Sequence, residues 1–121
     1  MLKKTIKYTD YNGTEREEDF YFNLSKAEVT EMELSIDGGM SQMIENIVKS
    51  QNNKEIVGMF KEIILKAYGE KSADGRRFMK SKEITENFSQ TEAFSELFVE
   101  LALNEDKAAD FIKGILPREI K

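Results

Sequence analysis

Hydrophobic and polar positions alternate at the start of this 121-residue chain and follow a helical repeat further on. Between residues 2 and 22 the alternation runs on both sides of an Asn-Gly pair, which predicts a β-hairpin. A two-residue Asn-Gly loop would put the apolar sets of the two strands on opposite faces. A three-residue loop over 11–13, with its glycine in the left-handed conformation, keeps Ile6, Phe20 and Phe22 on one face, and we predict this register.

The helical repeat is strongest over residues 54–68, where we predict the central helix of the fold. One set of apolar residues forms a single face, and a second set widens that face, which is typical of a helix covered on more than one side. Asn53 is placed to cap its start, and Gly69 stands where a left-handed C-terminal cap is needed. The first set is Ile56, Phe60, Ile63, Ile64 and Ala67, and the second is Val57, Met59 and Tyr68.

Two shorter helices are predicted before the central one. Ser25 and Glu28 have the spacing of a capping box, with Leu24 and Val29 at the flanking staple positions, so a helix begins there. A second helix is expected from about residue 40 to residue 49, where apolar residues again follow a helical repeat. The first of these helices has its apolar side at Ala27, Val29, Met32 and Leu34.

Three helices are predicted after the central one. Ser81 begins a short helix that reaches Asn87, and Ser89 with Glu92 forms a second capping box for the next. A last helix runs from about residue 105 to residue 114, and Pro117 stops it. The apolar stripes of the last two helices are Phe94, Leu97, Phe98, Leu101 and Ala102, and then Ala108, Phe111, Ile112 and Ile115.

The predicted fold class is α+β, predominantly α, with the N-terminal β-hairpin packed on a compact bundle of about five to six short helices. We predict a single domain over residues 1–121, since no repeat or long linker divides the chain. It consists of the hairpin (2–22), N-terminal helices (25–68), a loop that acts as a hinge (69–80) and C-terminal helices (81–116).

Composition removes most kinds of catalytic chemistry. The chain has no cysteine and no histidine, which excludes disulfides, thiolate metal sites, nucleophilic triads and imidazole bases. Its net charge of −5 disfavours binding to nucleic acid or to an anionic membrane. No segment approaches the roughly 20 apolar residues of a membrane span. We therefore expect no cofactor, no metal, no nucleic-acid or membrane partner, and a cytoplasmic location.

The remaining charged groups do not match known binding loops. The glycine-bounded residues 69–77 lack the residue order of a phosphate-binding loop and the oxygen ligands of a calcium-binding loop. The cluster of Arg76, Arg77, Lys80 and Lys82 is expected to be a solvated loop that pairs with nearby glutamates, with nucleic-acid contact as the alternative. Glutamates at four-residue spacing, Glu92, Glu96 and Glu100, predict a solvated acidic helix face, with a catalytic carboxylate pair as the alternative.

The aromatic stripe formed by Phe94, Phe98 and Phe111 has two interpretations. The first is that it belongs to the core. The second is that it forms a surface for a partner or for self-association, because short amphipathic helices offer more apolar faces than a small monomer easily covers. The candidate partner-binding residues on this second interpretation are Phe94, Leu97, Phe98, Phe111 and Ile115.

Five short segments of the chain carry a resemblance to known proteins. They are 21–28 (YFNLSKAE), 67–72 (AYGEKS), 74–78 (DGRRF), 88–94 (FSQTEAF) and 111–117 (FIKGILP). These segments resemble the tail assembly chaperones of long, non-contractile-tailed phages and prophages of Gram-positive bacteria. The resemblance extends from residue 21 to residue 117 and contains no catalytic motif.

This resemblance implies a non-enzymatic protein. Members of the family bind the aggregation-prone tape measure protein in the infected cell, keep it soluble, help to recruit tail tube protein and are absent from the finished tail. A longer product made by ribosomal frameshifting is common in the family. The alternatives are a structural virion component, such as a head–tail connector or tail terminator, and an acidic DNA mimic. Homo-oligomerisation is left open.

Overall fold

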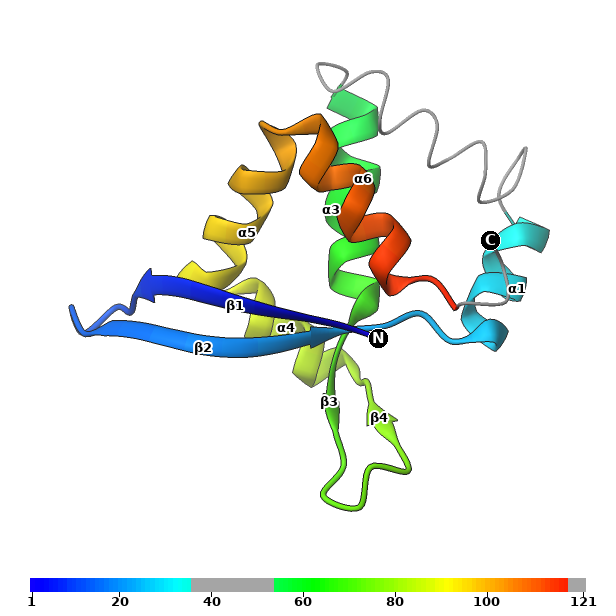
Figure 1. The fold of residues 1–121 in the computed structure, drawn as a ribbon, viewed down its shortest axis with the longest axis horizontal. Coiled ribbons are helices and arrows are strands. Elements are labelled where there is room, and N and C mark those ends of the chain that lie inside the picture. The colour runs from blue at the N-terminus through cyan, green and yellow to red at the C-terminus, as the bar shows by residue number, and fades with distance from the viewer. Residues whose placement is uncertain (36–53, 118–121) are drawn as a thin grey trace.

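A computed structural model describes residues 1–35 and 54–117 of the chain. These residues form an α+β fold in which a four-stranded antiparallel sheet accompanies five helices (Figure 1), and this confirms the predicted class. The elements are β1 (Leu2–Thr9), β2 (Glu15–Phe22), α1 (Lys26–Ser35), α3 (Lys54–Ala67), β3 (Tyr68–Lys71), β4 (Phe78–Met79), α4 (Lys82–Ser89), α5 (Glu92–Ala102) and α6 (Glu105–Ile115). The helix predicted over about 40–49 lies outside the described residues.

The first hairpin has the predicted register. Leu2 pairs with Phe22 and Thr9 pairs with Glu15, so the inward positions of β1 and β2 share one face. The backbone N–H of Asp10 donates to the Thr14 carbonyl at 2.9 Å, which leaves a three-residue loop. Gly13 in this loop has φ 81°, the left-handed conformation that glycine adopts without steric cost.

Residues 69–80, predicted to be a loop, instead contain most of a second hairpin. Strand β3 pairs with β2 through Tyr21–Gly69 and with β4 through Glu70–Met79. The prediction of a left-handed cap at Gly69 is therefore wrong, because α3 ends at Ala67 and Gly69 is the second residue of β3. In Figure 1 the hairpin β3–β4 extends away from α3, α5 and α6.

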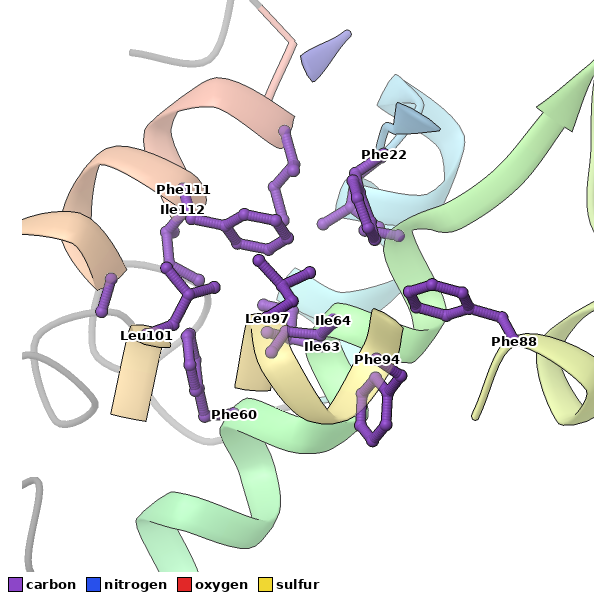
Figure 2. Close-up of a cluster of buried hydrophobic side chains, with 14 of the residues drawn as sticks. Phe22, Phe60, Ile63, Ile64, Phe88, Phe94, Leu97, Leu101, Phe111 and Ile112 are labelled. Carbon is purple, nitrogen blue, oxygen red and sulfur yellow. The ribbon is translucent and has the colours of Figure 1, made fainter. Parts of the chain in front are cut away.

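One hydrophobic cluster joins the inner face of the first hairpin to the helices (Figure 2). Phe22 lies edge-on to Phe111 at 5.2 Å and to Phe88 at 5.8 Å between ring centroids. Within the described residues, helix α3 contributes four buried residues to the cluster, the same number as α5 and as α6. Those of α3 are Phe60, Ile63, Ile64 and Ala67.

The starts of α1 and α4 follow the predicted signals. The Ser25 N–H donates to Glu28 Oε1 at 2.9 Å, and the Glu28 N–H donates to Ser25 Oγ at 3.2 Å, which is the predicted capping box of α1. Ser81 caps α4 by accepting from the Ile84 N–H at 3.1 Å.

The apolar side of α1 is narrower than predicted, because Ala27 is exposed and Leu34 is 85% exposed.

The predicted cap of α5 is wrong by two residues. Ser89 is the last residue of α4, and its hydroxyl donates back to the Glu86 carbonyl at 2.7 Å. Thr91 is the N-cap instead and accepts from the Phe94 N–H at 3.1 Å. The physical reason is that α4 continues beyond Asn87. Ser89 therefore lies in the last turn of α4 and does not cap the next helix.

Candidate functional site

Four of the five predicted partner-binding residues lie in the core. Phe94, Leu97, Phe111 and Ile115 are at most 6% exposed. This confirms the core interpretation of the aromatic stripe for Phe94 and Phe111. Phe98 is only partly buried and stacks against Phe94 with ring centroids 6.0 Å apart. Partner binding at these residues stays a prediction, and Phe98 is the one that the folded chain brings to the surface.

The outer side of α5 and its C-cap each carry one apolar residue that sequence reasoning missed, Val99 and Leu103. Val99 is 52% exposed and Leu103 is 80% exposed. The Leu103 N–H donates to the Val99 carbonyl at 3.1 Å, so the two side chains occupy the same helix face one turn apart. We call Phe98, Val99 and Leu103 the α5 apolar patch. The sequence did contain a signal for this exposure, because Val99 and Leu103 are apolar residues that fall outside the inward stripe, among polar positions.

The glutamates of α5 are used in polar contacts at the surface. Glu100 Oε1 accepts from Lys107 Nζ at 3.0 Å and lies 3.9 Å from Lys4 Nζ. Glu92 accepts a hydrogen bond from the Tyr11 hydroxyl, which raises the pKa of that tyrosine. Glu96 is exposed beside Lys7 and Arg16 in an open hollow of the first hairpin. These contacts agree with the predicted solvated acidic face.

The tip of the hairpin β3–β4 is held by its own polar groups. The Ser72 hydroxyl donates to Asp74 at 2.7 Å and accepts from the Arg77 N–H at 3.0 Å. The hydrogen bond from Ser72 is the main cause of the lowered pKa of Asp74. Gly75 completes the turn at φ 74°. The backbone that carries the two arginines is therefore ordered by local bonds.

The four residues of the predicted basic cluster have separate roles. Lys80 Nζ donates to both Glu28 carboxylate oxygens, at 2.7 and 2.9 Å, and to the Asn23 carbonyl at 2.7 Å. Lys82 lies 3.9 Å from Glu86 in an exposed pair on α4. The predicted pairing with glutamates is confirmed for these two lysines only. Within 1–35 and 54–117, no ion pair joins either Arg76 or Arg77, and both are exposed.

The pair between Lys80 and Glu28 connects the start of α4 to the start of α1. Burial alone would raise the pKa of Glu28, but hydrogen bonds from Lys80 and from the Ser25 backbone outweigh it and lower that pKa. Burial lowers the pKa of Lys80, opposed by its hydrogen bond to Glu28. The three hydrogen bonds of Lys80, at 2.7 to 2.9 Å, indicate a stabilised ion pair.

Two features considered from the sequence, a metal site and a membrane span, are absent from the residues that the structure describes. Among those residues, no group of three or more acidic side chains is arranged to hold a metal ion. No helix among them is both long enough and apolar enough to cross a membrane. What the surface does present is the α5 apolar patch and the arginines of the hairpin β3–β4, which are features suited to contacts with another protein.

Comparison with known proteins identifies the family. No match was found among curated proteins or among solved structures. The family described as phage tail assembly chaperone matches residues 1–121, the whole chain. This agrees with the resemblance carried by its short segments. The chain therefore belongs to the phage tail assembly chaperone family.

Proposed function

We propose that this protein binds the tape measure protein in the cytoplasm of the infected host, keeps it soluble and assists tail tube assembly around it. The observation that carries the proposal is membership of the tail assembly chaperone family over all 121 residues. On this proposal the protein acts without catalysis and is absent from the finished tail.

The α5 apolar patch is the surface that we assign to the tape measure protein. An amphipathic helix presents apolar residues at three- and four-residue spacing, and such a face packs well against an exposed apolar helix surface. Val99 and Leu103 have this spacing and are accessible without unfolding the core. The opposite side of α5 is buried in the core at Ala93, Phe94, Leu97 and Leu101, so a bound helix would rest on a firmly packed base.

Co-expression tests the proposal directly. The tape measure protein is produced alone and together with this chain, and its soluble fraction is measured after centrifugation. We expect the soluble fraction to rise with the chaperone and the two proteins to co-purify. Equal solubility in the two cases, with no complex, would contradict the proposed function.

A matched pair of variants tests the surface. Val99→Ser with Leu103→Ser removes the exposed part of the patch, and Leu34→Ser removes a leucine of similar exposure on α1. We expect tape measure binding to weaken about tenfold or more in the first variant, because two apolar contacts are lost, and to stay unchanged in the second. Equal binding by both variants would move the site away from α5.

Mass spectrometry separates the proposal from a structural role in the virion. Purified particles and infected-cell lysate are compared for peptides of this chain. We expect the peptides in lysate only. A constant number of copies in every purified particle would instead support the connector or tail terminator alternative.

A further inference from the structure

We propose that the hairpin β3–β4 is a binding site for an acidic polypeptide segment, with Arg76 and Arg77 as the groups that contact its carboxylates. This inference rests on the proposed function for the identity of the partner. It assigns a second contact to the same complex, and the chemistry of this contact differs from that of the α5 apolar patch.

The two arginines are available to a ligand. Both side chains are exposed, and within the part of the chain that the structure describes neither takes part in an ion pair. Two other charged residues of this region have partners within the protein: Lys80 pairs with Glu28, and Asp74 accepts a hydrogen bond from Ser72. A guanidinium group offers paired N–H donors that match the two oxygens of a carboxylate. Adjacent unpaired guanidinium groups therefore fit a ligand with several carboxylates.

The base of the hairpin fixes the position of its tip. Gly69 leaves room for the Phe78 ring, because a Cβ atom there would lie 2.6 Å from Phe78 Cε2. Lys71 Nζ lies over the Tyr21 ring at 4.7 Å from its centroid, which ties β3 to β2. Lys80 follows β4 directly and is bonded to α1. A preorganised hairpin loses little conformational freedom when it binds a ligand.

Charge favours an acidic partner at this hairpin. Residues 68–79, which form this hairpin, contain three basic and two acidic side chains, a formal charge of +1, whereas the whole chain carries −5 and the remainder therefore −6. A hairpin that projects from the body can attract a short acidic segment within the screening length of about 8 Å. A long nucleic acid would extend along the acidic remainder and be repelled by it. The inferred ligand is therefore a protein segment.

The first test uses a probe rather than the natural partner. A short fluorescent peptide of alternating glutamate and alanine is titrated with the full chain at low salt, and its anisotropy is followed. The same measurement is made with a glutamine version of the peptide and with a single-stranded DNA oligonucleotide. We expect binding of the glutamate peptide that weakens with added salt, and no comparable binding of the other two probes.

Variants locate the site. Arg76→Gln with Arg77→Gln is compared with Lys61→Gln with Lys113→Gln, which makes the same change in net charge at exposed positions on α3 and α6. We expect the arginine variant to bind the peptide about tenfold more weakly and the lysine variant to bind within about twofold of the unaltered chain. Equal losses in both variants, no binding by the unaltered chain, or tighter binding of DNA would each overturn the inference.

The natural complex separates this inference from the proposed function. The tape measure protein is captured by the unaltered chain and by the arginine variant, and the amounts are compared at low and physiological salt. If the unaltered chain captures the tape measure protein and the arginine variant captures less of it, both the inference and the proposed function hold. If both capture it equally, the inference fails and the proposed function stands. If the unaltered chain captures none, the proposed function fails, and the peptide titration alone decides the chemistry of the hairpin.

Discussion

Replacement of Lys80 by methionine tests the contact between the hairpin region and α1. The substitution keeps an unbranched side chain of similar length and removes the ammonium group with its bonds to Glu28 and to the Asn23 carbonyl. Because the structure makes Lys80 the link between the start of α4 and the capping box of α1, the loss should lower the stability of the whole domain.

The size of the effect depends on how far the Lys80 and Glu28 side chains are buried. The Lys80 and Glu28 side chains are 21% and 26% exposed. Exposed pairs are worth about 0–1 kcal/mol, and removal of one partner of a fully buried pair costs about 3–5 kcal/mol. A pair that is mostly covered should lie between these limits, so we expect a loss of about 2 kcal/mol in the free energy of unfolding. For a domain of this size that corresponds to about 8 °C in Tm.

Urea unfolding followed by circular dichroism measures this loss, and a double-mutant cycle assigns it. Glu28→Gln keeps the capping-box acceptor on α1 while removing the charge. The single variants and the double variant together give the coupling energy between positions 28 and 80, which we expect to be about 1–2 kcal/mol. A loss below about 0.5 kcal/mol with no coupling would refute the argument from burial and geometry.

The pH dependence of the stability provides a second test of the same ion pair. Glu28 has a pKa below its ordinary value of 4.5, so its contribution is present above that value and is lost as the pH falls through the lowered pKa. Without Lys80 the pKa should return toward 4.5, and the fall in stability across the acidic range should be smaller. An unchanged pH profile in Lys80→Met would contradict the assignment.

Two further substitutions test backbone features with internal controls. Gly69→Ala should cost about 1–3 kcal/mol, because its Cβ would lie 2.9 Å from the Met79 carbonyl oxygen and closer still to Phe78, whereas Gly58→Ala on the exposed side of α3 should stabilise by about 0.5–1 kcal/mol. Thermal unfolding of both variants shows whether the signs differ. Thr91→Ala should lose about 1 kcal/mol of cap energy in urea unfolding and Ser89→Ala much less, and the reverse order would restore the cap predicted from the sequence.

Local signals predicted those parts of the fold that depend on residues close together in the chain. The register of the first hairpin follows from its alternation and from one glycine in a three-residue loop. The capping box of α1 requires only residues 25 and 28. The cap of α5 was ambiguous because a serine and a threonine both precede Glu92, and only the true length of α4 decides between them.

The second hairpin depends on contacts that no local pattern contains. Strand β3 has four residues and β4 has two, and the pairing of Tyr21 with Gly69 joins segments far apart in the sequence. Gly69 follows an apolar helix, which is also the position of a common C-terminal cap. For a related reason, the sequence did not distinguish buried from exposed residues among the candidate partner-binding residues. A helical stripe identifies an apolar face, but other elements decide whether that face is covered.

The contact between Phe22 and Phe111 has a consequence for how this protein folds during synthesis. The first hairpin closes through neighbouring residues, but the core around Phe22 requires α6, and the Leu24 N–H donates to the Ile115 carbonyl at 2.8 Å. Contacts this distant in sequence must close a long loop before they contribute, and they slow folding. A nascent chain thus keeps the Phe22 ring without its Phe111 contact until the last helix has left the ribosome.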